Sequence, residues 1–192
     1  MQLFSFFTIQ SNVIAGVVAA MLALDPLRDG RVWRVARLDA LLGIVITGLV
    51  FDFVLAPLVH LTGWALVATV LFHYVMPWGT LLAWLVLGPR RRWSWVTVVA
   101  AFVWPVAWLV YTFVRGAIVG WYPYPFLDAG RLGLGPALLN SLLVVLVAVL
   151  LAVVFTVVDR RVPAAIGTPD TSSADSNSGS QDGSRVLPQR PR

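Results

Sequence analysis

Five blocks of apolar residues, each long enough to cross a lipid bilayer, constrain this sequence more than any other feature. They cover about residues 3–24, 40–61, 64–87, 93–114 and 136–158. A helix that crosses a bilayer needs about 20 predominantly apolar residues. The blocks are continuously apolar, whereas the strands of a membrane β-barrel alternate apolar and polar residues. The sequence therefore predicts an all-α fold, a polytopic transmembrane helix bundle with five spans.

Composition agrees with this class and excludes others. Only 12% of the residues are charged, about half the share found in soluble domains. There is no cysteine, which excludes disulfides and thiolate metal sites. The net charge of +5 would suit a nucleic-acid partner, but the arginines flank the apolar blocks and do not form one basic face. We therefore expect membrane lipids as partners and no nucleic acid.

The arginines alternate between the connections and so predict an orientation. Nine arginines lie in the first connection, in the third connection and directly after the last block, whereas only two lie in the others. Arginine-rich connections stay in the cytoplasm. The N-terminus is therefore predicted outside and the C-terminus in the cytoplasm, as five spans require. The arginines of the richer set are Arg28, Arg31, Arg34, Arg37, Arg90, Arg91, Arg92, Arg160 and Arg161.

The two ends of the chain and one connection have their own compositions. The first block lacks a positively charged leader, so it resembles a retained span more than a cleavable signal peptide. Residues 162–192 are rich in Ser, Asp and Gly, which predicts a disordered cytoplasmic tail after a transmembrane domain over 1–161. Residues 120–136 alternate aromatic residues with prolines, which indicates an interfacial loop able to cap a cavity.

Polar residues are concentrated in the predicted outer half of the bundle. Thr8, Ser11 and Asn12 follow the i, i+3, i+4 spacing of one helix face. Asp52 and His73 each lie about nine residues from the outer end of their span. The inner half offers little beyond threonines, which argues against a channel or transporter. We expect a polar, outward-opening cavity, lined by these residues with Tyr124, Asp128 and Asn140.

Most of these residues also have a structural interpretation. A membrane-helix Thr commonly bonds the carbonyl four residues back. Asn12 and Asn140 suit interhelical hydrogen bonds. Asp52 is costly in hydrocarbon unless it is protonated or paired, for example with His73. His73 is as well explained by a structural role as by a functional one.

Several kinds of site are not expected. There is no glycine-rich phosphate loop and no serine nucleophile elbow. His60 lies at the end of a span and His73 lies deep in the next one, too far apart in depth to share a haem or a metal. We therefore predict no metal and no cofactor. Pro57, Pro77 and Pro105 are expected to kink their helices.

Three stretches, in order, resemble the androgen-induced-gene family of integral membrane proteins, which includes a regulator of tissue factor pathway inhibitor. FFTIQSN contains Thr8, HYVMP contains His73, and YPFLD contains Tyr124 and Asp128. The chain is also similar to bacterial proteins described as integral membrane regulators, which implies a bacterial plasma membrane location. The resemblance covers about residues 3–161.

This resemblance implies a threonine hydrolase of fatty-acid esters, with Thr8 as nucleophile and His73 as general base. The chain departs from the animal proteins because it lacks an apolar segment ahead of the Thr-bearing span. By span position Thr8 is shallower than His73 by at least a turn, so a tilt or a kink at Pro77 has to bring them within about 3 Å. Asp52 could then orient His73. The alternative is a non-catalytic regulatory or lipid-binding protein.

Overall fold

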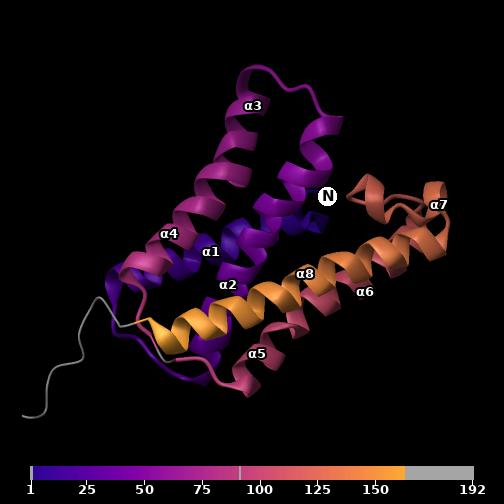
Figure 1. Cartoon of the computed structure of the whole chain (residues 1–192). Helices are drawn as coiled ribbons and strands as arrows, with labels where there is room; N and C mark the ends of the chain where they lie inside the picture. The colour runs from indigo at the N-terminus through magenta and orange to yellow at the C-terminus, as the bar shows by residue number, and fades with distance from the viewer. Residues whose placement is uncertain (1, 91, 163–192) are drawn as a thin grey trace, which may run out of the picture.

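The computed structural model describes residues 2–90 and 92–162, and every regular element in these ranges is helical (Figure 1). The predicted tail lies outside the described residues, except for Val162. The α-helices are α1 (Phe7–Leu24), α2 (Arg31–Val50), α3 (Gly63–Val70), α4 (Met76–Leu87), α5 (Trp95–Ala101), α6 (Val103–Val119), α7 (Ala129–Leu132) and α8 (Leu134–Arg161).

Five helices or helix pairs in the described part of the chain are long and apolar enough to span a membrane. The five predicted spans are therefore confirmed, and the protein is a multi-pass helical bundle. The main difference is at the second span, which begins at Arg31 and not near residue 40. Three of the arginines assigned to the first connection thus lie on α2. The five ranges are Phe7–Leu24, Arg31–Leu58, Gly63–Leu87, Trp95–Val119 and Leu134–Arg161.

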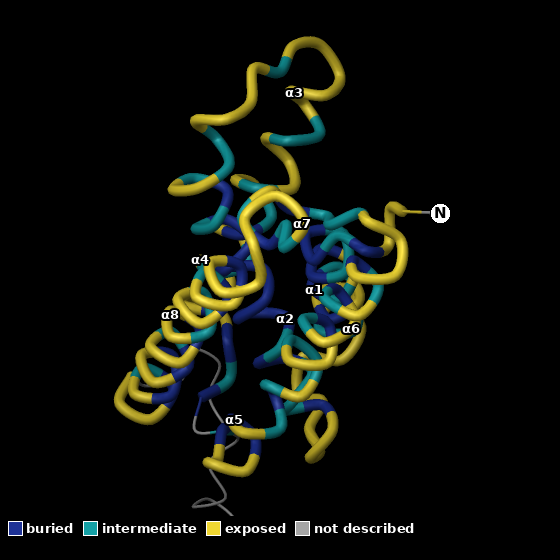
Figure 2. The backbone as a smooth tube through the Cα atoms, turned by 90° about the vertical axis from the view of Figure 1, so that its right-hand side faces the viewer, coloured by how far each residue is buried: buried dark blue, intermediate teal, exposed yellow. Residues whose placement is uncertain are grey.

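Helix α2 forms the centre of the bundle (Figure 2). Leu38, Leu41, Ile44 and Val45 are almost completely buried, and these positions cover more than one face of the helix. A helix that is apolar all round is typical of an interior position. The other spans pack around it, and α1 makes the most extensive contact with it.

Each of the three prolines expected to kink a helix lies at or next to an interruption of regular α-helix. Pro57 follows a π-helical segment, Phe51–Leu55, and Pro77 follows a second one, Leu71–Val75. Pro105 lies just after the break between α5 and α6. Proline lacks an N–H and its ring crowds the carbonyl four residues back, so an α-helix cannot continue unchanged. The wider turns of the two π segments accommodate this disturbance.

The hairpin that connects α2 to α3 projects away from the rest of the bundle (Figures 1 and 2). No residue of α3 is buried, and the aromatic side chains of Phe53 and Trp64 are 79% and 87% exposed. Apolar side chains exposed on a membrane span contact lipid at little cost. The hairpin begins and ends at the two π segments, so both of its arms leave the bundle at the same level.

A buried carboxylate secures the opposite end of the bundle. Asp159, near the end of α8, is fully buried and accepts hydrogen bonds from the backbone N–H groups of Arg92 and Trp93, at 2.8 and 3.2 Å. Arg90 is also buried and lies over the Trp84 ring. Burial lowers the pKa of the Arg90 guanidinium, and nearby Asp159 raises it. We call this the Asp159 end.

This cluster corrects the prediction that the half of the bundle opposite Thr8 holds few polar groups. From the sequence, Arg37 is assigned to the first connection, and Asp159 lies just beyond the predicted last block, which ends near residue 158. In the structure α2 and α8 extend further, and both side chains are buried between helices.

Candidate active site

Thr8 has a hydroxyl that its own helix does not use. It lies in the first turn of α1, and the carbonyl four residues back, that of Phe4, belongs to the preceding 3-10 turn and accepts from the Gln10 side chain instead. The first N–H groups of a helix also lack intrahelical partners. Thr8 is buried, so both its hydroxyl and its backbone N–H need tertiary partners.

Tyr124 supplies a partner for both groups. Its phenolic oxygen lies 3.0 Å from the Thr8 backbone nitrogen, which donates to it, and 3.1 Å from Thr8 Oγ1. Burial raises the pKa of the Tyr124 phenol, and the hydrogen bonds from Thr8 lower it by less. The phenol is therefore neutral near pH 7 and keeps a proton to donate.

Packing and hydrogen bonds hold the loop that carries Tyr124. The Tyr122 ring lies so close to Gly116 of α6 that a Cβ there would come within 2.2 Å of it. Asn140 of α8 donates from Nδ2 to the Phe126 carbonyl at 2.9 Å. The predicted aromatic loop thus covers the end of the bundle where Thr8 lies, fixed to α6 on one side and to α8 on the other.

His73 approaches Thr8 from the second π segment. Its Nε2 lies 3.5 Å from Thr8 Oγ1, longer than an ordinary hydrogen bond but within reach after a small shift. Its Nδ1 lies 3.1 Å from the Thr69 carbonyl oxygen, which can only accept. The imidazole stacks on Phe51 of the first π segment, with ring centroids 4.1 Å apart.

These contacts define one consistent set of proton positions. The Thr69 carbonyl places the neutral imidazole proton on Nδ1, which leaves the Nε2 lone pair facing Thr8. The Tyr124 oxygen accepts from the Thr8 N–H, so its own proton can point to Thr8 Oγ1. The Thr8 hydroxyl then donates to His73. The hydrogen bonds thus run from the Tyr124 phenol to the Thr8 hydroxyl and from there to the His73 imidazole, which acts as a base. A hydroxyl that donates to a base in this way is an activated nucleophile.

Asn12 and Ser11 support the site from the next turn of α1. Asn12 Nδ2 donates to the carbonyls of Thr8 and Phe72, at 2.8 and 3.3 Å, and so joins α1 to the segment that carries His73. Ser11 donates to the Phe7 carbonyl and bonds Thr47 Oγ1 at 2.8 Å. Both side chains position the helices, and neither lines the cavity described below.

The three remaining candidates make no hydrogen bond with Thr8 or His73. Asp52 makes no hydrogen bond with His73, and the role of orienting the imidazole, which the sequence assigned to Asp52, belongs to the Thr69 carbonyl. Asp128 caps α7 by accepting from the Arg131 backbone N–H. Asn140 fixes the aromatic loop and does not line the cavity.

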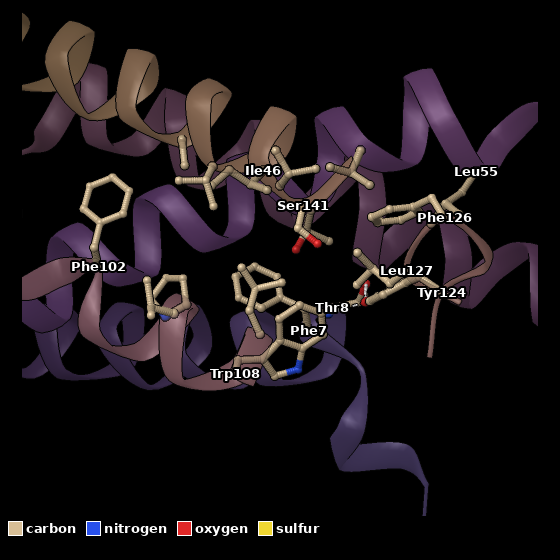
Figure 3. Close-up of a pocket in the computed structure, with 18 residues that line it drawn as sticks. Phe7, Thr8, Ile46, Leu55, Phe102, Trp108, Tyr124, Phe126, Leu127 and Ser141 are labelled. Carbon is tan, nitrogen blue, oxygen red and sulfur yellow. Dashed lines mark hydrogen bonds between the residues drawn. The ribbon is translucent and has the colours of Figure 1, made fainter. Parts of the chain in front are cut away.

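A cavity of about 70 Å³ extends from Thr8 into the bundle (Figure 3). Thr8 and Tyr124 lie at one end, and Phe102 lies at the other (Figure 3). Helices α1, α2, α6 and α8 and the aromatic loop line it, almost entirely with apolar groups. We call it the apolar cavity. Its lining residues are Phe7, Thr8, Ile46, Thr47, Val50, Leu55, Phe102, Pro105, Val106, Trp108, Leu109, Tyr124, Phe126, Leu127, Ser141, Val144, Val145 and Ala148.

The apolar lining overturns the prediction of a polar cavity. Thr47 and Ser141 reach its wall, but their hydroxyls bond the carbonyls four residues back, those of Gly43 and Ala137, at 2.9 Å. The structural interpretation of membrane-helix hydroxyl groups is correct for these two residues. Thr8 and Tyr124 are the pair at the cavity wall whose hydroxyl groups bond each other, whereas Thr47 bonds its own helix and also Ser11 of α1.

Thr8 and His73 meet because the spans do not begin at one level. The α2–α3 hairpin projects past the first turn of α1, so a residue well inside the third span is level with Thr8. Gly48 of α2 permits the close packing: a Cβ there would come within 2.9 Å of the Pro77 ring and 3.3 Å of the His73 carbonyl oxygen. The sequence signalled the kink at Pro77 but not the Gly48 contact.

No protein-family model matches this chain, and neither the curated proteins nor the solved structures include a match to it. The candidate site therefore rests on its own geometry.

Proposed function

We propose that this chain is an integral membrane hydrolase of lipid esters, in which Thr8 is the nucleophile and His73 is the general base. The observation that carries the proposal is the series Tyr124–Thr8–His73–Thr69, in which a threonine hydroxyl faces an imidazole nitrogen at 3.5 Å and the other nitrogen is held by a carbonyl. The resemblance to the androgen-induced-gene family supports the same assignment.

The reaction follows from the proton positions. Thr8 Oγ1 attacks the ester carbonyl carbon while its proton passes to His73 Nε2, and the carbonyl becomes a tetrahedral oxyanion. Collapse of this intermediate breaks the ester C–O bond, and the departing alcohol takes the proton from His73. Water, deprotonated by His73, then attacks the acyl-threonine, and the collapse releases the fatty acid and restores the Thr8 hydroxyl.

Tyr124 has a second use in this sequence. Once Thr8 Oγ1 has bonded to the acyl carbon, the Tyr124 phenol is free to donate to the oxyanion beside it. The first turn of α1 adds the positive end of a helix dipole at the same place. A donor aimed at the oxyanion contributes about 10²–10³ in rate.

The site is proposed to open to the outer leaflet of a bacterial plasma membrane, with the N-terminus outside and the C-terminus in the cytoplasm. The arginine distribution supports this orientation. Membrane lipid esters are then the nearest substrates.

A second candidate function is lipid binding without catalysis. The apolar lining of the cavity favours it, because apolar groups beside Thr8 can contact hydrocarbon whether or not Thr8 reacts. The two candidates differ in one property, the reactivity of the Thr8 hydroxyl.

The test is labelling of the purified protein with a fluorophosphonate probe, followed by mapping of the modified residue. We expect labelling at Thr8, abolished by Thr8→Val and lowered about 10²–10⁴-fold in rate by His73→Ala. Tyr124→Phe removes the donor but keeps the ring, and is expected to slow labelling by about 10²-fold.

Thr47→Val is the matched control, because Thr47 lines the same cavity but its hydroxyl bonds its own helix and Ser11. It should label like the parent. Labelling that survives in Thr8→Val, or a parent that does not react while it still binds fatty acid, would support the lipid-binding candidate instead.

A further inference from the structure

Pro77 leaves one backbone carbonyl without its usual partner, directly beside His73. In the second π segment the Met76 N–H bonds the Leu71 carbonyl, five residues back. The same spacing would give the Phe72 carbonyl a donor at position 77, but that residue is proline and has no N–H. In a membrane span, a carbonyl freed in this way has to find its donor on a side chain or on a neighbouring helix.

Asn12 supplies that donor from α1. Its Nδ2 donates to the Phe72 carbonyl at 3.3 Å and to the Thr8 carbonyl at 2.8 Å. Both partners are carbonyls, which can only accept, so these bonds fix which end of the amide carries the NH2 group. Asn12 is buried, and within the described residues its Oδ1 has no hydrogen-bond partner. A buried acceptor without a partner is costly, so the two donated bonds account for this side chain.

We propose that Asn12 is a positioning residue for the reaction, which sets the distance between the base and the nucleophile. The proposal rests on the proposed function, but its geometry can be measured without any reaction. One nitrogen atom bonds the residue that bears the nucleophile and the residue next to the base, where His73 Nε2 lies 3.5 Å from Thr8 Oγ1. A misplacement of about 1 Å can lower a rate about 10²-fold.

The other contacts of the imidazole come from its own span and from the second span. The Thr69 carbonyl belongs to the same span as His73, and the stacked Phe51 belongs to the second span. Within the described residues, two hydrogen bonds join this segment to α1: the long contact between Thr8 and His73, and the bond that Asn12 donates. The Asn12 bond is the shorter of the two, so it is the one able to hold the longer contact in place.

The experiment uses His73 as a spectroscopic probe in the full-length protein. The chain has two histidines, so His60→Gln leaves one imidazole, and nitrogen NMR of isotope-labelled histidine in detergent micelles reports the hydrogen bond that Nε2 accepts. Thr8→Val removes the donor and gives the reference signal. Asn12→Ser is the test variant, because its short hydroxyl can still bond the Thr8 carbonyl of its own helix but does not reach Phe72. We expect its Nε2 signal to move most of the way to that of Thr8→Val.

Thr47→Val is the matched control. Thr47 also bonds α1 through its side chain, but at Ser11, and its other bond is to its own helix. It should keep the parent's Nε2 signal. Asn12→Leu, which leaves no polar group at this position, repeats the test if Asn12→Ser does not fold. A parent-like signal in the folded Asn12 variant would overturn the proposal. So would a Thr8→Val signal identical to that of the parent, because there would then be no hydrogen bond for Asn12 to set.

Labelling rates separate a positioning role from a purely structural one. Asn12→Ser should lower fluorophosphonate labelling at Thr8 by about 10–10²-fold. In a His73→Ala background the same change should alter the rate by less than about twofold, because residues that act through one contact are not additive. Equal losses in both backgrounds would mean that Asn12 only stabilises the fold. A shifted NMR signal in a protein that never labels would retain the positioning inference and remove only the catalytic one.

Discussion

The two ends of the bundle both bury polar side chains, but they arrange them differently. At the Asp159 end, a carboxylate accepts from two backbone N–H groups and holds a connection against α8. At the Thr8 end, neutral groups from three separate parts of the chain meet at one hydroxyl. The first arrangement holds two parts of the chain together and so stabilises the fold. The second leaves a base facing a hydroxyl beside an apolar cavity.

The difference separates stability from function. A buried charge costs several kcal/mol unless its partners are fixed, so loss of Asp159 would leave backbone groups without partners inside the protein. The Thr8 hydroxyl contributes two neutral contacts, one of them long. Polar groups at the Asp159 end should therefore control unfolding, and those at the Thr8 end should control reactivity.

The largest expected effect on stability is that of Asp159→Ala. It removes the acceptor of two buried N–H groups and should lower the free energy of unfolding by about 3 kcal/mol or more. Thermal unfolding in detergent measures this. Asp159→Asn keeps one carbonyl acceptor and should lose less. Asp52→Asn is the control at the opposite end, where the half-buried carboxylate makes no such cap, and it should change stability by no more than about 0.5 kcal/mol.

An Asp159→Ala protein that unfolds like the parent would break the comparison. It would mean that Arg90, Trp84 and Trp93 hold the connection without the carboxylate. The stacked rings of Trp84 and Trp93, with centroids 5.5 Å apart, are the contacts that would then have to do so.

The next largest effect is that of Gly48→Ala, which should change both stability and reactivity. The substitution acts at the packing contact that positions His73. The new methyl group would overlap the Pro77 ring and should cost about 1–3 kcal/mol through forced displacement. The displaced segment carries His73, so fluorophosphonate labelling at Thr8 should fall as well. Gly16→Ala on α1 is the control, since nothing lies within 4 Å of its Cβ. Normal labelling in Gly48→Ala would show that the Gly48 contact does not set the position of His73 relative to Thr8.

Sequence reasoning reached the five spans, the three prolines that interrupt α-helix and the pairing of Thr8 with His73. The first two follow from span length and proline chemistry, which are local properties, whereas the pairing of Thr8 with His73 was implied by the family resemblance. Sequence reasoning failed on depth, since it started every span at one membrane plane. The hairpin that projects at the two π segments breaks that assumption, and only the packing of Gly48 against Pro77 shows by how much.

The other failures have a common cause. Thr47 and Ser141 lie at the cavity wall, but each hydroxyl bonds a carbonyl of its own helix, whereas Asp159, just beyond the predicted end of the last block, is buried. In each case the hydrogen-bond partner of the polar atom determines whether the side chain contributes to the cavity or to the packing of the bundle. That partner is either four residues away, which the sequence can state, or about sixty residues away, which it cannot.

The smallest effect comes from an exposed carboxylate at the Asp159 end. Asp29 accepts from both Arg34 and Arg92. The hydrogen bond from Arg34, followed by the Gly30 backbone N–H and then the charge of Arg92, holds the Asp29 pKa well below the usual range. A lowered folded pKa means that the unfolded chain binds more protons, so this contribution to stability is complete above about pH 4 and is lost as the pH falls further.

Exposed pairs are screened, and Asp29→Asn should cost less than about 1 kcal/mol at neutral pH. The difference in unfolding temperature between parent and Asp29→Asn should shrink in high salt and below pH 4. A cost as large as that of Asp159→Ala, insensitive to salt, would mean that ion pairs, and not the buried cap, hold this end of the bundle together.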